Sequence, residues 1–182
     1  MTTLNEYLAQ KRLAFEAIKA RAAAPDAAPR PFGASVTAEG RSGVRRIRIR
    51  DFQVISDSGP EFAGYDLGPS SPELQLGVLG SCVTHITLIQ AADRGVPLES
   101  LTVDVTAEID PRAGKAGFEH VPVSPQNIRY TINIVSTASA QDIAGLHEAV
   151  ERVCPILNLL KHPQSIQSEV RLSTSDAAAE AA

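Results

Sequence analysis

The sequence has no tryptophan, one methionine and two cysteines, and aromatic residues make up only 4% of its 182 positions. So few aromatic side chains disfavour modules that stack bases or sugars on aromatic rings. The chain also lacks an excess of basic residues, since 17 Lys and Arg stand against 21 Asp and Glu, a formal charge of −4. Dedicated nucleic-acid binders are usually basic, so we expect no nucleic-acid partner.

No segment is both long and uniformly apolar. The most apolar stretch, residues 74–92, carries several polar side chains, and we expect it not to cross a membrane. The first 20 residues are charged and lack the apolar centre of a signal peptide. We therefore expect a cytoplasmic protein, in which two cysteines are more often buried, metal-binding or redox-active than a structural disulfide.

The chain divides into an N-terminal appendage and one larger domain. Residues 3–23 show the apolar stripe of an amphipathic helix, and the Pro- and Ala-rich residues 24–31 are typical of a linker. With 43% hydrophobic residues, the rest of the chain can form a core. We predict a helix and linker over 1–31, one domain over 32–172 and a disordered tail over 173–182.

Periodicity predicts an α+β domain with antiparallel sheet around a central buried helix, because no repeating βα pattern is present. The central helix spans residues 72–94, with Pro72 in its first turn and Gly95 at its end. In the strand 44–52 isoleucines alternate with arginines, so one face is apolar and the other basic. The other expected elements are strands over 34–39, 101–109, 128–134 and 166–172, a helix capped by Ser139, and a short helix over 155–161.

The central helix carries small residues at regular intervals. Gly77, Gly80 and Thr84 lie along one stripe, although glycine lowers helix propensity. Such a stripe allows another backbone to approach closely. We expect the same helix of a second copy to pack there, giving a homodimer.

The two cysteines and one histidine are the first candidates for chemistry. Cys82 lies within the central helix, where a cysteine is often only a small core residue. Cys154 precedes Pro155; at a helix N-cap the free amides and the helix dipole would favour its thiolate, whereas it could also merely fill a gap. His85 follows Cys82 by three residues. No Cys-x-x-Cys or His-x-x-x-His pair is present, so we expect neither a metal nor another cofactor.

Arginines form the remaining candidate group. Arg41, Arg45, Arg46, Arg48 and Arg50 all lie in or beside the predicted hairpin. Such a run usually forms a solvated strand face, although a single guanidinium could stabilise a thiolate or hold an oxygen substrate. Composition and spacing by themselves leave the function open among these residues.

Two segments resemble the OsmC/Ohr family of thiol-dependent hydroperoxide reductases. In residues 68–84 a loop and a Pro-Glu-Leu step open the helix that holds Cys82, and residues 94–105 supply the helix end and strand that usually follow. The second segment is Cys-Pro-Ile-Leu-Asn at 154–158. The resemblance covers residues 32–172 and leaves the N-terminal helix outside the family pattern.

This resemblance implies an OsmC/Ohr-like α+β fold with an extra N-terminal helix, and an intertwined homodimer with active sites between chains. It implies that Cys82 is the peroxidatic nucleophile and Cys154 the resolving thiol. Glu73 would hold a catalytic arginine, for which Arg41 is the best match and Arg46 or Arg48 are substitutes. The implied activity is the reduction of organic hydroperoxides, with a dithiol reductant restoring the enzyme.

Other functions stay open beside the peroxidase. A non-enzymatic relative could bind a small apolar or acyl ligand in the dimer cleft, although such a binder needs no second cysteine. Two weaker alternatives are an acyl hydrolase with His85 as base and a nucleic-acid site on the basic strand. One difficulty is geometric: nine helical residues place Glu73 and Cys82 about 13 Å apart on nearly opposite faces, so a shared site needs a long arginine, a helix bend or a second subunit.

Overall fold

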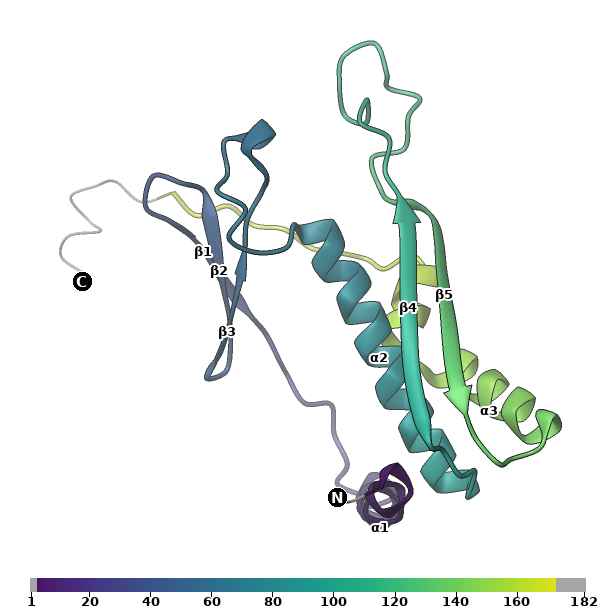
Figure 1. The fold of residues 1–182 in the computed structure, drawn as a ribbon. Helices are drawn as coiled ribbons and strands as arrows, with labels where there is room; N and C mark the ends of the chain where they lie inside the picture. The colour runs from purple at the N-terminus through teal and green to yellow at the C-terminus, as the bar shows by residue number, and fades with distance from the viewer. Residues whose placement is uncertain (1–2, 173–182) are drawn as a thin grey trace.

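Residues 3–172 of the computed structural model form four α-helices and two separate antiparallel sheets (Figure 1). The predicted α+β class is confirmed. The tail proposed for 173–182 lies outside the described residues. In chain order the elements are α1 (Leu4–Ala22), β1 (Ser35–Glu39), β2 (Val44–Ile49), β3 (Phe52–Ser56), a 3-10 turn (Pro60–Phe62), α2 (Ser71–Arg94), β4 (Ser100–Glu108), β5 (Gln126–Val135), α3 (Ala140–Val153) and α4 (Pro155–Lys161).

Helix α2 is the centre of the fold, and β4, α1, α3 and α4 all pack against it. Ser70 caps its start, and Gly95 ends it in a left-handed conformation at φ 72°. Its length and hydropathy alone would suit a membrane span. One side instead forms the core of the chain, where Leu79, Val83 and Ala91 are fully buried.

One member of the small-residue stripe of α2, Gly80, packs within its own chain, and contact of a second copy with the rest of the stripe stays a prediction. Gly80 faces β4 of its own chain, and a Cβ added there would lie 3.2 Å from the side chain of Val105. Gly80 therefore permits close helix–sheet packing within one chain rather than contact with a second copy. Gly77 has open space around it.

The β4–β5 hairpin covers α2. Leu101, Val103 and Val105 of β4 point toward the helix, and the residues between them face solvent. This alternation matches the pattern predicted from the sequence. Ile132 and Ile134 do the same on β5.

The N-terminal sheet β1–β2–β3 stands apart from α2 and the β4–β5 hairpin (Figure 1). The predicted strand over 44–52 is wrong in length, because the chain reverses at Arg50 (φ 54°) and Asp51 to start β3. The alternation continued across this turn and concealed it. The strand register gives the sheet one apolar face, formed by Val36, Ile47, Ile49, Phe52 and Val54.

The strand predicted over 166–172 is also wrong. Residues 163–172 run extended and exposed but join neither sheet. An alternating sequence becomes a strand only where a sheet edge accepts its backbone hydrogen bonds. Within the described part of this chain the segment meets no such edge.

Helix α1 docks on the C-terminal end of α2. Leu8 is 5% exposed and lies in a cluster with Ala91, Ala92 and Leu98. The Arg12 Nε donates to the Ala92 carbonyl at 2.6 Å, so a cation meets the negative end of the α2 dipole. An ion pair between α1 and α2 and a side-chain cap on the Leu98 amide add to this contact.

We predict that Leu8→Ala lowers the free energy of unfolding by about 2–3 kcal/mol, because it opens a cavity between α1 and the core. Leu13→Ala on the same helix is the matched control. Leu13 is 69% exposed, and its change should stay within about 0.5 kcal/mol. Urea denaturation of both variants measures the difference. Equal, small effects would contradict the docking of α1.

Candidate active site

The two cysteines lie 72 positions apart in the sequence, but their sulfur atoms are 3.5 Å apart. Cys82 lies midway along α2, and Cys154 lies between α3 and α4. The Cys154 thiol donates to the sulfur of Cys82. Both are free thiols; Cys82 is half-buried and Cys154 is fully buried.

The Cys-Pro step holds Cys154 in place. Helix α3 ends at Val153, and Pro155 takes the first position of α4, where its missing N–H is not needed. The Cys154 amide donates to the Val150 carbonyl at 2.9 Å, and its own carbonyl accepts from the Asn158 side chain at 2.8 Å. The backbone on both sides of the thiol is therefore bonded, which points its side chain toward α2.

Burial raises the pKa of the Cys154 thiol, and the neighbouring Cys82 sulfur raises it further. The amides of Leu157 and Ile156 at the start of α4 lower this pKa, as predicted for an N-cap, but the loss of solvation outweighs them. The α4 N-terminus thus acts on Cys154 in the expected direction, but burial is the larger effect and the net pKa is raised. Cys154 keeps its proton and can donate it to the Cys82 sulfur.

Cys82 opens onto a shallow apolar cavity of about 410 Å³. Cys154 does not line it. A small molecule entering from solvent therefore meets Cys82 first, with Cys154 behind it. The lining residues are Leu74, Gly77, Val78, Ser81, Cys82, His85 and Ile156.

Glu73 and Arg41 lie away from the thiols in this chain. Glu73 closes the cap of α2, where its Oε2 accepts from both the amide and the hydroxyl of Ser70 at 2.7 Å. These two bonds lower the pKa of Glu73. Arg41 is exposed in the β1–β2 turn, in the sheet that stands apart from α2. The chain thus brings Cys82 and Cys154 together but brings neither Glu73 nor Arg41 to them.

Two of the other arginines, Arg45 and Arg46, have partners in the sheet or the loop that follows it, whereas Arg48 is exposed on β2. Arg46 pairs with Glu39 across the hairpin, a contact that lowers the pKa of Glu39. Arg45 is half-buried and donates to the Ser56 hydroxyl at 3.0 Å and to the Asp57 carbonyl at 2.7 Å. On the basic face of β2, which carries Arg46 and Arg48, the Arg46 charge is therefore paired within the protein, while Arg45 lies at the end of the opposite, apolar face.

Asp57, which was not among the residues predicted to be functional, organises the loop between β3 and α2. Its buried carboxylate accepts from the amides of Tyr65 and Leu67 at 3.0 and 3.2 Å. Backbone hydrogen bonds, above all from Ser58, lower the pKa of Asp57. An aspartate directly before a Gly- and Pro-rich loop was the available signal.

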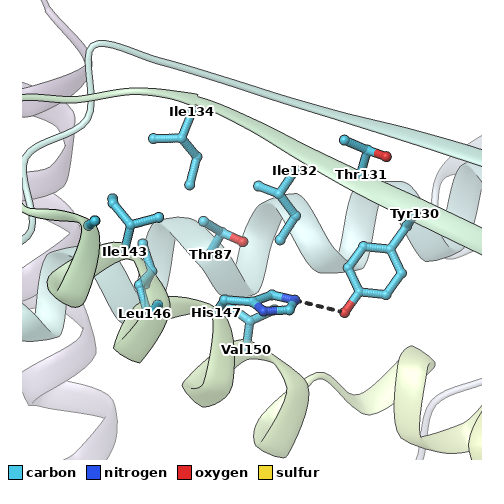
Figure 2. A pocket seen from close by; sticks show the side chains of 11 residues that line it. Thr87, Tyr130, Thr131, Ile132, Ile134, Ile143, Leu146, His147 and Val150 are labelled. Carbon is cyan, nitrogen blue, oxygen red and sulfur yellow. Dashed lines mark hydrogen bonds between the residues drawn. The ribbon is translucent and has the colours of Figure 1, made fainter.

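A second cavity of about 480 Å³ lies between β5 and α3, over α2 (Figure 2). Its walls are mostly apolar, with Ile132, Ile143 and Leu146 among them. At one end the Tyr130 hydroxyl lies 3.4 Å from His147 Nε2, as the dashed line shows, and it donates to Glu151. Neither cysteine lines this cavity, so it is separate from the two thiols.

Residues 3–172 contain no group of three or more His, Cys, Asp and Glu side chains arranged to hold a metal ion. The described site consists of two adjacent thiols, one lining an apolar cavity and one buried behind it. The fold and the site together describe an α+β protein with a pair of adjacent thiols.

Comparison with known proteins gives the family. Residues 64–169, more than half of the chain, match the model for OsmC-like proteins, and the protein belongs to this family. No curated protein matches the sequence. The fold is similar to that of an OsmC-like protein from Mycoplasma pneumoniae, with a TM-score of 0.63 and 16% identity over 74% of this chain and 89% of that one.

Two further structures share the fold. A protein from Legionella pneumophila, described as an organic hydroperoxide resistance protein OsmC, aligns with a TM-score of 0.52 and 15% identity over 74% of this chain and 92% of that one. A protein from Psychrobacter arcticus is described as a putative osmotic stress induced and detoxification response protein. It aligns with a TM-score of 0.57 and 16% identity over 72% of this chain and 89% of that one. Helix α1 lies outside the matched family residues.

Proposed function

We propose that this protein is a thiol peroxidase that reduces organic hydroperoxides, with Cys82 as the peroxidatic and Cys154 as the resolving cysteine. The observation that carries the proposal is the 3.5 Å separation of the two sulfur atoms. Thiols brought this close from remote parts of a chain need to approach only to about 2.05 Å to form a disulfide. Membership of the OsmC-like family supports the same chemistry.

The assignment of roles follows from access and proton affinity. The nucleophile must meet the substrate as a thiolate, and Cys82 lines the cavity that opens to solvent. Cys154 is buried, and its raised pKa keeps it protonated. A protonated Cys154 can stabilise the Cys82 thiolate by its hydrogen bond and can attack after the first oxidation.

The proposed catalytic cycle has three steps. The Cys82 thiolate attacks the terminal peroxide oxygen; the O–O bond breaks, the sulfur becomes a sulfenic acid, and the alkoxide takes a proton and leaves as an alcohol. The Cys154 sulfur then attacks the Cys82 sulfur, forming the disulfide and releasing water. A dithiol reductant reduces the disulfide to two thiols and is itself oxidised to a disulfide.

The lining of the cavity favours organic hydroperoxides over hydrogen peroxide. Leu74, Val78 and Ile156 give Cys82 an apolar surround. An alkyl or aryl substituent would remove this surface from water, with a gain of about 0.8 kcal/mol for each buried CH₂ group. Hydrogen peroxide has no such substituent.

Glu73 and Arg41 enter the proposal through a homodimer. Both residues lie away from Cys82 within one chain, so an arginine held by a carboxylate near the thiolate would have to come from the partner. An arginine suits this place because it keeps its charge at every physiological pH. The apolar face of the N-terminal sheet supports such an assembly, since Val36, Ile49, Phe52 and Val54 are exposed on it.

We place the enzyme in the cytoplasm, where thiol reductants keep cysteines reduced. A dithiol reductant of the cytoplasm would reduce the Cys82–Cys154 disulfide at the end of each turnover. Both cysteines would then rest as free thiols between turnovers.

The proposal is tested by counting thiols during stopped-flow mixing with cumene hydroperoxide or hydrogen peroxide. We expect free thiols to fall from two to zero per chain, with cumene hydroperoxide reacting faster. Mass spectrometry should show the loss of two hydrogens and a cross-linked peptide pair containing Cys82 and Cys154. Protein alkylated beforehand is the control and should consume no peroxide.

If both cysteines are still free thiols after treatment with peroxide and can be alkylated, the peroxidase proposal is wrong. The result would favour a family member that binds a small apolar or acyl ligand without chemistry. The apolar cavity at Cys82 is the observation that such a binder would use.

A further inference from the structure

His85 lines the same cavity as Cys82, one helical turn further along α2. Side chains three positions apart on a helix have Cβ atoms about 5–6 Å apart. Helical side chains also lean toward the N-terminus of their helix, which directs the His85 imidazole toward the turn that holds Ser81 and Cys82. Helix geometry and cavity lining therefore put the imidazole and the thiol on the wall of one cavity, where a change of the His85 rotamer can bring them into a hydrogen bond that is not formed in this structure.

The groups around His85 keep it in its neutral form. His85 is exposed at the rim of the cavity, where desolvation by the neighbouring atoms lowers its pKa and the positive charge of Lys11 on α1 lowers it further. From α4 the titratable group at this side is Cys154, which keeps its proton. Lys161, also on α4, pairs with Glu151. A neutral imidazole can accept a proton, whereas an imidazolium cannot.

We propose that His85 is the general base that takes the proton of the Cys82 thiol and returns it to the departing alkoxide. This inference rests on the proposed function. The proton moves from Cys82 Sγ to the His85 ring as the thiolate forms. After the O–O bond breaks, the imidazolium gives that proton to the alkoxide, so the alcohol leaves neutral and His85 is neutral again.

The same geometry gives α1 a part in the chemistry. Helix α1 lies outside the matched family residues, yet it docks on α2 through Leu8 and Arg12 and places Lys11 near His85. Lys11 makes no contact with the thiol cavity itself. Its charge acts on His85 only at a distance: it lowers the pKa of His85, and so lowers the pH at which His85 becomes protonated and stops working as a base.

Alkylation by iodoacetamide tests this without peroxide. In a Cys154→Ser background Cys82 is the single thiol, and its rate of alkylation is measured from pH 5 to pH 9. The rate should fall as pH decreases through the lowered pKa of His85, because the protonated ring no longer accepts a proton. His85→Gln should lower the rate near pH 7 by about 10²-fold, the lower end of what a positioned base contributes.

Lys11→Gln removes a positive neighbour, so the pKa of His85 rises and the fall in rate should begin at higher pH. His147→Gln, on α3 and away from the cavity, is the matched control and should leave the profile unchanged. Circular dichroism confirms that each variant is folded. An unchanged rate and pH profile in His85→Gln would overturn the inference. If His85→Gln shifts the profile but the parent protein consumes no peroxide, the peroxidase proposal is wrong, the return of the proton to an alkoxide is wrong with it, and His85 remains the base that deprotonates Cys82.

Discussion

Cys82→Ser should abolish peroxide consumption, with a rate lower by on the order of 10⁴-fold or more, as when an enzyme loses its nucleophile. Cys82 is the sulfur that reaches the substrate cavity, and a serine hydroxyl does not attack an O–O bond. The remaining Cys154 is buried and protonated, so it cannot take over. The measurement is consumption of cumene hydroperoxide with an excess of a dithiol reductant.

Cys154→Ser should give a different result, because the resolving thiol is needed for recycling and not for the first oxidation. One peroxide should be consumed per chain, and a sulfenic acid on Cys82 should be trapped by dimedone. A monothiol reductant that attacks the sulfenic acid directly should restore turnover in this variant. Equal loss in both variants, with no trapped sulfenic acid, would refute the assignment of roles.

We also expect the protein to form a homodimer. We expect light scattering to give a mass about twice the 19.3 kDa of the chain. In one chain Phe52 is 63% exposed, and Val36, Ile49 and Val54 on the same face of β1–β3 are exposed as well. A patch of this kind on three hydrogen-bonded strands is typical of a protein interface. The symmetric partner is a second copy of the chain.

Phe52→Asp should dissociate the dimer into monomers, because it would bury a charge in the interface. Peroxidase activity should be lost as well, because the arginine supplied by the partner would no longer reach Cys82. Gln53→Glu is the matched control, since Gln53 is the next residue and lies on the opposite face of β3. It should remain dimeric and active. A fully active monomer at micromolar concentration would refute the shared site and leave Glu73 and Arg41 without a route to Cys82.

Local signals predicted most of the secondary structure. Ser139, Pro155 and Gly95 mark helix ends through hydrogen bonds and dihedral angles that these residue types make by themselves, and the observed ends agree. The alternation of Leu101, Val103 and Val105 placed β4 correctly within a residue at each end. The hairpin at Arg50 was missed because its side chains continue the strand alternation through a turn.

The sequence by itself determined the α+β class, the central helix and the Cys-Pro step, because periodicity and capping are properties of short segments. It suggested the pairing of Cys82 with Cys154 only through a family resemblance. Tertiary structure decided the rest. It brought two remote sulfurs to 3.5 Å, buried Cys154 deeply enough to reverse the effect of its N-cap on the pKa, and turned Gly80 toward β4. These outcomes depend on the packing of α2 against β4 and α4, and no local pattern encodes distances between segments that meet only when the chain has folded.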